Sequence, residues 1–86
     1  MKNKKYKPIS KCPTSLTEKD IGHIRRIAIH HLKNHESLTN RGLRGIVDIT
    51  YDQAIYFYRR MLDRGVLERV GISSGTKYIL KGTKRR

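Results

Sequence analysis

The apolar side chains of this 86-residue chain are confined almost entirely to the stretch between Leu16 and Leu80. The segments on either side carry very few, so they contribute little to a buried core. A core drawn from about 65 residues supports one small domain and no more. The sequence therefore predicts a folded domain over residues 15–81, a disordered basic arm over residues 1–14 and a basic C-terminal tail over residues 82–86.

The positive charge of the chain is concentrated in its two end segments. Of the 20 lysines and arginines, five lie in residues 1–13 and four in residues 81–86, whereas all seven acidic residues lie between these segments. Basic segments without acids repel themselves, and a polyanion binds them by releasing its counterions. The net charge of +13 therefore favours a nucleic acid as the partner, with a solubilising surface as the alternative.

Membrane and secreted classes are disfavoured by what the sequence contains. Cys12 is the single cysteine, so no disulfide framework is available, as expected for a reducing compartment. No apolar run approaches the ~20 residues that span a membrane, and no apolar segment follows the basic start as in a secretory signal. We expect a cytoplasmic, nucleoid-associated protein with no membrane partner.

The first helix is predicted over residues 18–34. Ser15 and Thr17 are both candidate N-caps, because an acidic residue follows each of them three positions later. Apolar residues then recur at spacings of three and four, at Ile21, Ile24, Ala28 and Leu32. This spacing is typical of one buried stripe on an amphipathic helix.

Two further helices and a hairpin are predicted in the rest of the chain. Thr39 precedes a short helix over residues 40–47, whose two glycines weaken its helix propensity. Thr50 opens a T-x-x-Q capping box for a third helix over residues 51–64, which Gly65 ends. Two β-rich runs at 66–70 and 76–80, joined by small and polar residues, indicate a β-hairpin.

The third helix divides into two faces when its residues are placed at 100° intervals. The face predicted to be buried carries Ala54, Phe57, Tyr58, Met61 and Leu62. The face predicted to be exposed carries Asp52, Ile55, Tyr56, Arg59 and Asp63. This division predicts that Tyr58 packs in the core and that the residues of the exposed face are available to a partner.

The order helix, short helix, helix, hairpin resembles the winged helix-turn-helix domains of bacterial and archaeal transcription regulators. The stretches that carry this resemblance are 38–50, 52–54, 62–71 and 75–78, and it extends over residues 17–80. It is especially similar to the domains at the C-termini of helicase-related and Schlafen-like regulators. The resemblance implies an α+β fold with three helices and a C-terminal wing, which binds double-stranded DNA and regulates transcription.

The chain departs from the pattern of these domains at two places. Gly42 and Gly45 stand in the second helix, where bulkier residues are common. Ile55 and Tyr56 stand in the third helix, where arginine or lysine is usual, which favours more apolar and aromatic contact with DNA.

The resemblance makes the helix over residues 51–64 the recognition helix in the major groove. Arg59 is suited to a guanine edge and Asp52 to cytosine, while Gln53 is suited to adenine unless its amide serves the cap. Phosphate contacts are expected from the second helix, the wing and the tails. The predicted DNA-binding residues are Thr39, Asn40, Arg41, Arg44, Thr50, Tyr51, Asp52, Gln53, Ile55, Tyr56, Arg59, Arg60, Ser74, Thr76 and Lys77.

Two alternatives to a sequence-reading regulator stay open at this point. One is a chromatin-like architectural protein that binds DNA independently of sequence, and the other is a protein-interaction winged helix within a larger nucleic-acid machine. An enzyme is not expected, because no phosphate-binding Gly-rich loop, carboxylate pair or activated nucleophile is present. No cofactor or metal is expected, since the pair His31 and His35 lacks a clear third ligand. A monomer and a homodimer both fit the sequence.

Overall fold

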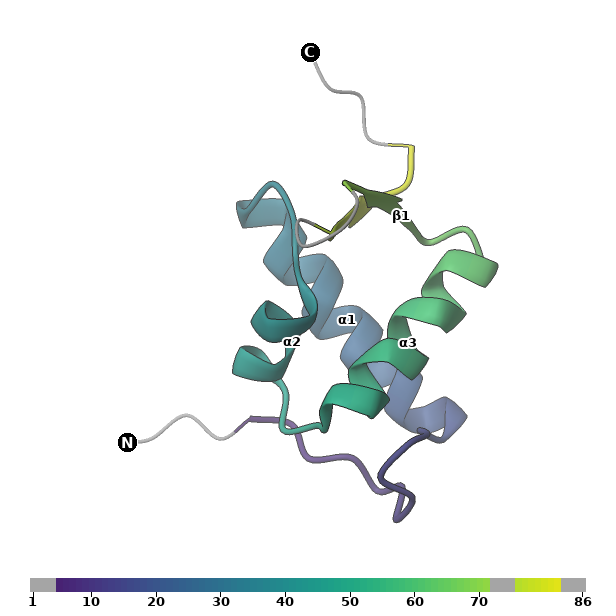
Figure 1. Ribbon diagram of the computed structural model, residues 1–86. Helices are drawn as coiled ribbons and strands as arrows, with labels where there is room; N and C mark the ends of the chain where they lie inside the picture. The colour runs from purple at the N-terminus through teal and green to yellow at the C-terminus, as the bar shows by residue number, and fades with distance from the viewer. Residues whose placement is uncertain (1–4, 72–75, 83–86) are drawn as a thin grey trace.

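The computed structural model describes residues 5–71 and 76–82, and in these residues three helices are followed by two strands. The elements are α1 (Glu18–Asn34), α2 (Asn40–Ile46), α3 (Tyr51–Asp63), β1 (Leu67–Val70) and β2 (Lys77–Leu80) (Figure 1). The predicted order of elements and the α+β class are confirmed. The arrangement is compatible with a winged helix. No helix of the described residues is long and apolar enough to cross a membrane.

Helix α1 has the bounds that the sequence predicts. Of the two candidate caps, Thr17 is the N-cap, and its hydroxyl accepts the backbone N–H of Asp20 while the Asp20 carboxylate accepts the N–H of Thr17. The predicted apolar stripe is buried along the helix. Asp20 is buried with it, at 0% exposure, which the apolar pattern did not predict.

Helices α2 and α3 differ from the prediction only at their ends. Helix α2 stops one residue early, with Val47 as its C-cap. Helix α3 ends at Asp63, and Gly65 follows its C-cap in the left-handed region at φ 70°. In α2, a Cβ on Gly42 would lie 3.2 Å from the Leu38 side chain, so close packing accounts for this glycine.

The hairpin is antiparallel, and it is joined to the segment before α2. Leu67 pairs with Leu80 and Val70 pairs with Lys77. Tyr78 also exchanges two backbone hydrogen bonds with Leu38, at 2.8 and 2.9 Å. The sheet is thereby fixed to the helices through its second strand.

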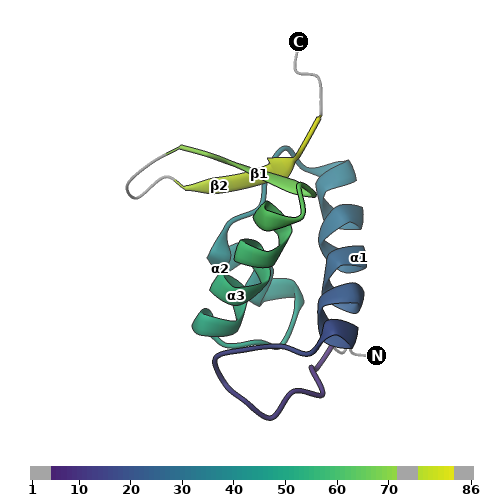
Figure 2. The ribbon, with the colours of Figure 1, turned by 90° about the vertical axis from the view of Figure 1, so that its right-hand side faces the viewer.

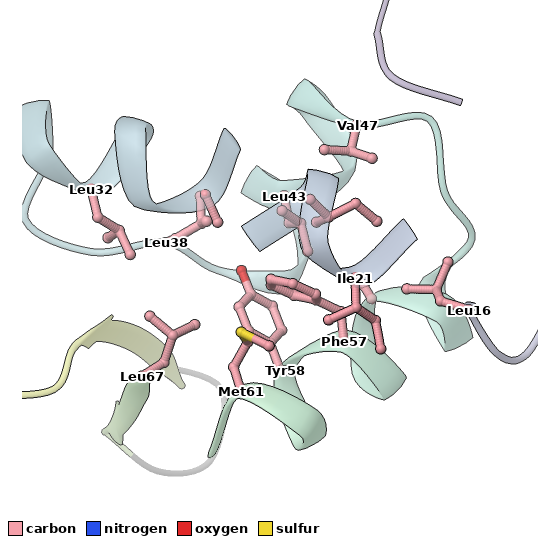
Figure 3. Packing of buried hydrophobic residues seen from close by; sticks show 13 residues of the cluster. Leu16, Ile21, Leu32, Leu38, Leu43, Val47, Phe57, Tyr58, Met61 and Leu67 are labelled. Atoms are coloured by element: carbon pink, nitrogen blue, oxygen red, sulfur yellow. The ribbon is translucent and has the colours of Figure 1, made fainter. Parts of the chain in front are cut away.

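One core joins all three helices to β1. Figure 3 shows Ile21 of α1, Leu43 of α2, Phe57 of α3 and Leu67 of β1 in a single cluster. Tyr58 is only 2% exposed, its ring stacks on Tyr78 at 3.7 Å, and its hydroxyl donates to the carbonyl of Thr39 at 2.8 Å. The predicted core role of Tyr58 is confirmed.

Residues 5–14 do not form the disordered arm that the sequence predicts over residues 1–14. The segment crosses beneath the N-terminal ends of α1 and α3 (Figure 2). The buried Asp20 carboxylate accepts the Tyr6 hydroxyl at 2.7 Å and the backbone N–H groups of Ile9 and Ser10 at 2.8 and 3.0 Å. These polar contacts, together with the packing of Tyr6 against the core, hold a segment that has few apolar residues. Residues 1–4 and 83–86 lie outside the described residues, so the outer parts of both predicted tails do too.

Candidate nucleic-acid interface

The outward face of α3 forms one side of a shallow hollow of about 290 Å³. Its lining residues are Thr14, Asp52, Ile55, Tyr56 and Arg59. Four of these were predicted to contact DNA, and the structure brings them together as one continuous face. Arg59 and Asp52 are exposed, whereas Ile55 and Tyr56 are half-buried. The face therefore offers a cation, an anion and an apolar and aromatic surface side by side.

Gln53 is not part of this face, because its amide serves the cap of α3 in place of the predicted DNA contact. The side chain is only 5% exposed. Its Oε1 accepts the N–H of Thr50 at 3.0 Å, and its Nε2 donates to the carbonyls of Cys12 and Ser15 at 2.9 and 3.1 Å. Because each polar atom of the amide is engaged within the protein, none is available to a base edge.

Thr50 is also engaged within the protein. Its hydroxyl accepts the N–H of Gln53 at 3.0 Å and donates to the carbonyl of Pro13 at 2.6 Å. The loop over residues 12–15 is thus attached to the N-terminal end of α3. A DNA backbone that approaches this end meets the loop as well as the helix.

The polar residues of α2 contact one another and the start of α3. The Asn40 Oδ1 accepts the Arg44 Nε at 2.6 Å, and the Arg44 guanidinium lies 5.4 Å from the centre of the Tyr51 ring. Tyr51 is 58% exposed, so it is available at the surface. The Thr39 hydroxyl accepts the N–H of Gly42 as the cap of α2. Arg41 is exposed, and among the predicted residues of α2 it is the most accessible cation.

Arg60, also predicted to contact DNA, is less exposed than Arg59. Its guanidinium is 5.5 Å from the centre of the Tyr56 ring, and the residue is only half-exposed. Its Nε is buried without a hydrogen-bond partner among the described residues. The Arg60 guanidinium therefore packs against the Tyr56 ring, and only part of it is accessible to a ligand.

The described residues of the hairpin include two exposed cations, Arg69 on β1 and Lys77 on β2, and only Lys77 was predicted to contact DNA. Lys77 is exposed at the start of β2, whereas Thr76 is half-buried and already has a polar or ring contact. Ser74 lies outside the described residues, so its predicted contact is not placed.

Two residues of the N-terminal segment join this surface although the sequence did not single them out. Thr14 lines the hollow on α3, and the Lys5 Nζ donates to the carbonyl of Arg44 at 3.3 Å. Cys12 is exposed next to Thr14, and hydrogen bonds with Ser15 and Thr14 lower the pKa of its thiol to about 7. No periodic pattern marks these residues, because hydrogen bonds to Asp20 and Gln53 position them.

The charges on this surface are largely unpaired. Within residues 5–71 and 76–82 the one ion pair joins Arg64 to Glu18 at 2.9 Å, at the opposite end of α3 from the hollow. Arg41, Arg59 and Lys77 are exposed and have no carboxylate partner among these residues. Such unneutralised cations favour an anionic ligand.

The histidine pair of α1 has a geometry unlike that of a metal site. The rings of His31 and His35 are stacked 4.0 Å apart, and the His35 Nδ1 lies 3.1 Å from the carbonyl of His31. Burial lowers the pKa of His31, and the neighbouring histidine charges act in the same direction. Among the described residues no group of three or more His, Cys, Asp and Glu side chains could hold a metal ion.

Comparison of the chain with protein-family models, curated proteins and solved structures found no match. Its function is therefore inferred from its own fold, charge and surface.

Proposed function

We propose that this chain is a winged helix domain that binds double-stranded DNA through α3 and acts as a transcription regulator. The observation that carries the proposal is the exposed face of α3, with unpaired cations on the elements around it. An α-helix with side chains is about 10–12 Å wide, which fits the ~12 Å major groove of B-DNA. Helix α2 lies beside α3, and the hairpin projects past it as a wing would (Figure 2).

Base contacts in this proposal come from the middle of α3. Arg59 has the geometry to pair with guanine O6 and N7, Asp52 accepts from cytosine N4, and Ile55 contacts a thymine methyl group. Phosphate contacts come from two exposed cations outside α3, Arg41 on α2 and Lys77 on β2.

Binding without strong sequence preference is the second candidate, and one observation favours it. The amides of Gln53 and Asn40, the side chains suited to adenine, are engaged within the protein. Competition with random duplex separates the candidates, because a specificity ratio near one supports sequence-independent binding.

The first test is the salt dependence of duplex binding, measured by fluorescence anisotropy on the full chain. If about five to eight phosphates are neutralised, the slope of log affinity against log salt is roughly −4.5 to −7. Duplex should bind more tightly than single-stranded DNA or RNA of the same length. A slope near zero, or preference for the single strand, would overturn the proposal.

Two arginine variants of equal charge test the role of α3. Arg59→Ala should cost about 1–3 kcal/mol in discrimination between a selected duplex and random DNA. Arg64→Ala is the matched control, because its guanidinium is held by Glu18. Equal effects of the two substitutions would show that net charge alone governs binding.

Cys12 offers a footprint of the same surface. Its thiol is exposed, next to the loop that lines the hollow on α3. Saturating duplex should slow its alkylation by iodoacetamide at least several-fold. An unchanged rate would place the DNA elsewhere on the protein.

A further inference from the structure

The outer face of α1 carries a straight row of cations. Lys19, Arg26 and Lys33 follow one another at intervals of seven, and all three are exposed. Residues seven apart differ by only about 20° around an α-helix and by about 10 Å along it. The row is therefore about 20 Å long.

No carboxylate on α1 is available to neutralise this row. Of the two acidic residues of the helix, Asp20 is buried and Glu18 is paired with Arg64. An exposed helical face in a soluble protein ordinarily mixes both signs of charge, and opposite charges at spacings of three and four stabilise it. The outer face of α1 lacks such pairs, so its cations repel one another until an anionic partner binds.

Gly22 provides an independent observation on the same face. It lies in the interior of α1, and a Cβ placed on it would meet nothing within 4 Å. Glycine here destabilises the helix relative to alanine, with neither close packing nor a left-handed backbone to explain it. It opens a shallow hollow of about 340 Å³, lined by Gly22, Arg25, Arg26 and Ile29. A missing side chain beside two arginines lets another molecule's backbone approach closely.

The row and the α3 face point away from each other. The buried stripe of α1 and the buried stripe of α3 enter the same core, so the outward faces of the two helices lie on opposite sides of the domain. Figure 2 shows α1 as a separate layer, with α2 and α3 together on one side of it.

We propose that the outer face of α1 binds the phosphate backbone of a second DNA duplex, so that one chain bridges two duplexes. A row of evenly spaced cations complements the repeating charge of a phosphate backbone. Ile29, which is half-buried, is the one apolar residue that lines the hollow, so the face lacks the apolar anchors that a protein interface needs. Binding of the first duplex rests on the function proposed above, whereas the second face stands on its own geometry.

The test is capture of a fluorescent duplex by full-length protein bound to a bead-immobilised duplex. Replacing Lys19, Arg26 and Lys33 together by alanine should reduce capture at least tenfold, while the affinity for the immobilised duplex falls by less than threefold. Gly22→Ala is the charge-neutral test. It should raise the melting temperature, because alanine favours the helix, and yet reduce capture several-fold.

Each of the other outcomes decides a separate point. Capture that survives both sets of α1 substitutions overturns the inference and indicates bridging by a protein dimer. The inference is also overturned if the α1 face binds an acidic protein and the α1 substitutions leave capture of the second duplex unchanged. If Arg59→Ala with Lys77→Ala leaves single-duplex binding intact while the α1 substitutions abolish it, the function proposed for α3 fails and α1 is the primary DNA-binding face.

Discussion

The two N-terminal caps of α1 and α3 perform the same task with different chemistry. In each, a threonine and the residue three positions later exchange hydrogen bonds, and the second residue also holds part of the N-terminal segment. Asp20 holds Tyr6, Ile9 and Ser10 by accepting hydrogen bonds. Gln53 holds Cys12 and Ser15 by donating them.

The difference lies in how each cap responds to its surroundings. Burial alone raises the pKa of Asp20, but hydrogen bonds from Tyr6, Ile9 and Thr17 outweigh it and hold this pKa at about 2. The Asp20 cap is therefore charged and strong, and it is sensitive to acid. The Gln53 cap is neutral, so its contribution is weaker and independent of pH.

The largest effect should come from Asp20→Ala. The substitution leaves the hydroxyl of Tyr6 and several backbone N–H groups without their acceptor, and hydrogen bonds to a charged group each contribute about 1.5–3 kcal/mol. We expect a loss of about 3 kcal/mol or more in the free energy of unfolding, measured by urea denaturation. A loss below about 1 kcal/mol would show that the N-terminal segment is not held by this carboxylate.

The second effect is acid destabilisation through the same group. The pKa of Asp20 is lower in the folded state, at about 2, than the ~3.9 of an unfolded chain, so its stabilising contribution is present above about pH 4. It is lost as the pH falls through about 2 and corresponds to roughly 2 kcal/mol. Urea unfolding of the wild type at pH 6, 4 and 2.5 should show this slope. Asp20→Asn should flatten it, and an equal slope in both proteins would contradict the assignment.

Gln53 gives a smaller effect that does not depend on pH. Gln53→Ala removes the bonds to Thr50, Cys12 and Ser15 and should cost about 1–3 kcal/mol at both pH 4 and pH 7.

Gln53→Glu sharpens the contrast between the two caps. A carboxylate facing the carbonyls of Cys12 and Ser15 is disfavoured, so the folded-state pKa of the new glutamate should be raised. Relative to the wild type, which shares Asp20, this variant should be most stable below the ordinary glutamate pKa and lose stability as the pH rises, opposite in sign to Asp20. A stability relative to the wild type that increases with pH would contradict the donor role of Gln53.

The smallest effect compares the two capping threonines. Thr17→Ala should cost about 1 kcal/mol, as N-cap replacements commonly do. Thr50→Ala should cost about 1 kcal/mol more, because the Thr50 hydroxyl also donates to the carbonyl of Pro13. Equal losses in thermal unfolding would show that the contact with Pro13 adds nothing to stability.

The caps also explain what the sequence predicted well and what it did not. Helix α1 and the T-x-x-Q box were predicted because capping and apolar spacing are local patterns. The position of residues 5–14 was missed because it depends on one buried carboxylate and one buried amide. Their partners lie about ten and about forty residues away in the chain, and neither spacing is a local pattern. The hydrogen bonds from Gln53 to the carbonyls of Cys12 and Ser15 occupy the amide that was predicted to contact DNA. They also hold the loop that carries Thr14 next to the α3 face. Asp52, Ile55, Tyr56 and Arg59 were found together because helical periodicity alone places them on one face.

The order of synthesis sets when the N-terminal segment can dock. Its contacts with Asp20 span only about ten residues, so they can form early, as soon as α1 leaves the ribosome. Its contacts with Gln53 and Thr50 are separated by 41 and 37 positions. Thr50 and Gln53 lie 16 and 19 residues beyond the end of α1 at Asn34, so at about 5–20 residues per second they emerge roughly 1–4 s after it. During translation the segment is therefore attached at one end first, and α3 completes its docking only after most of the chain has been made.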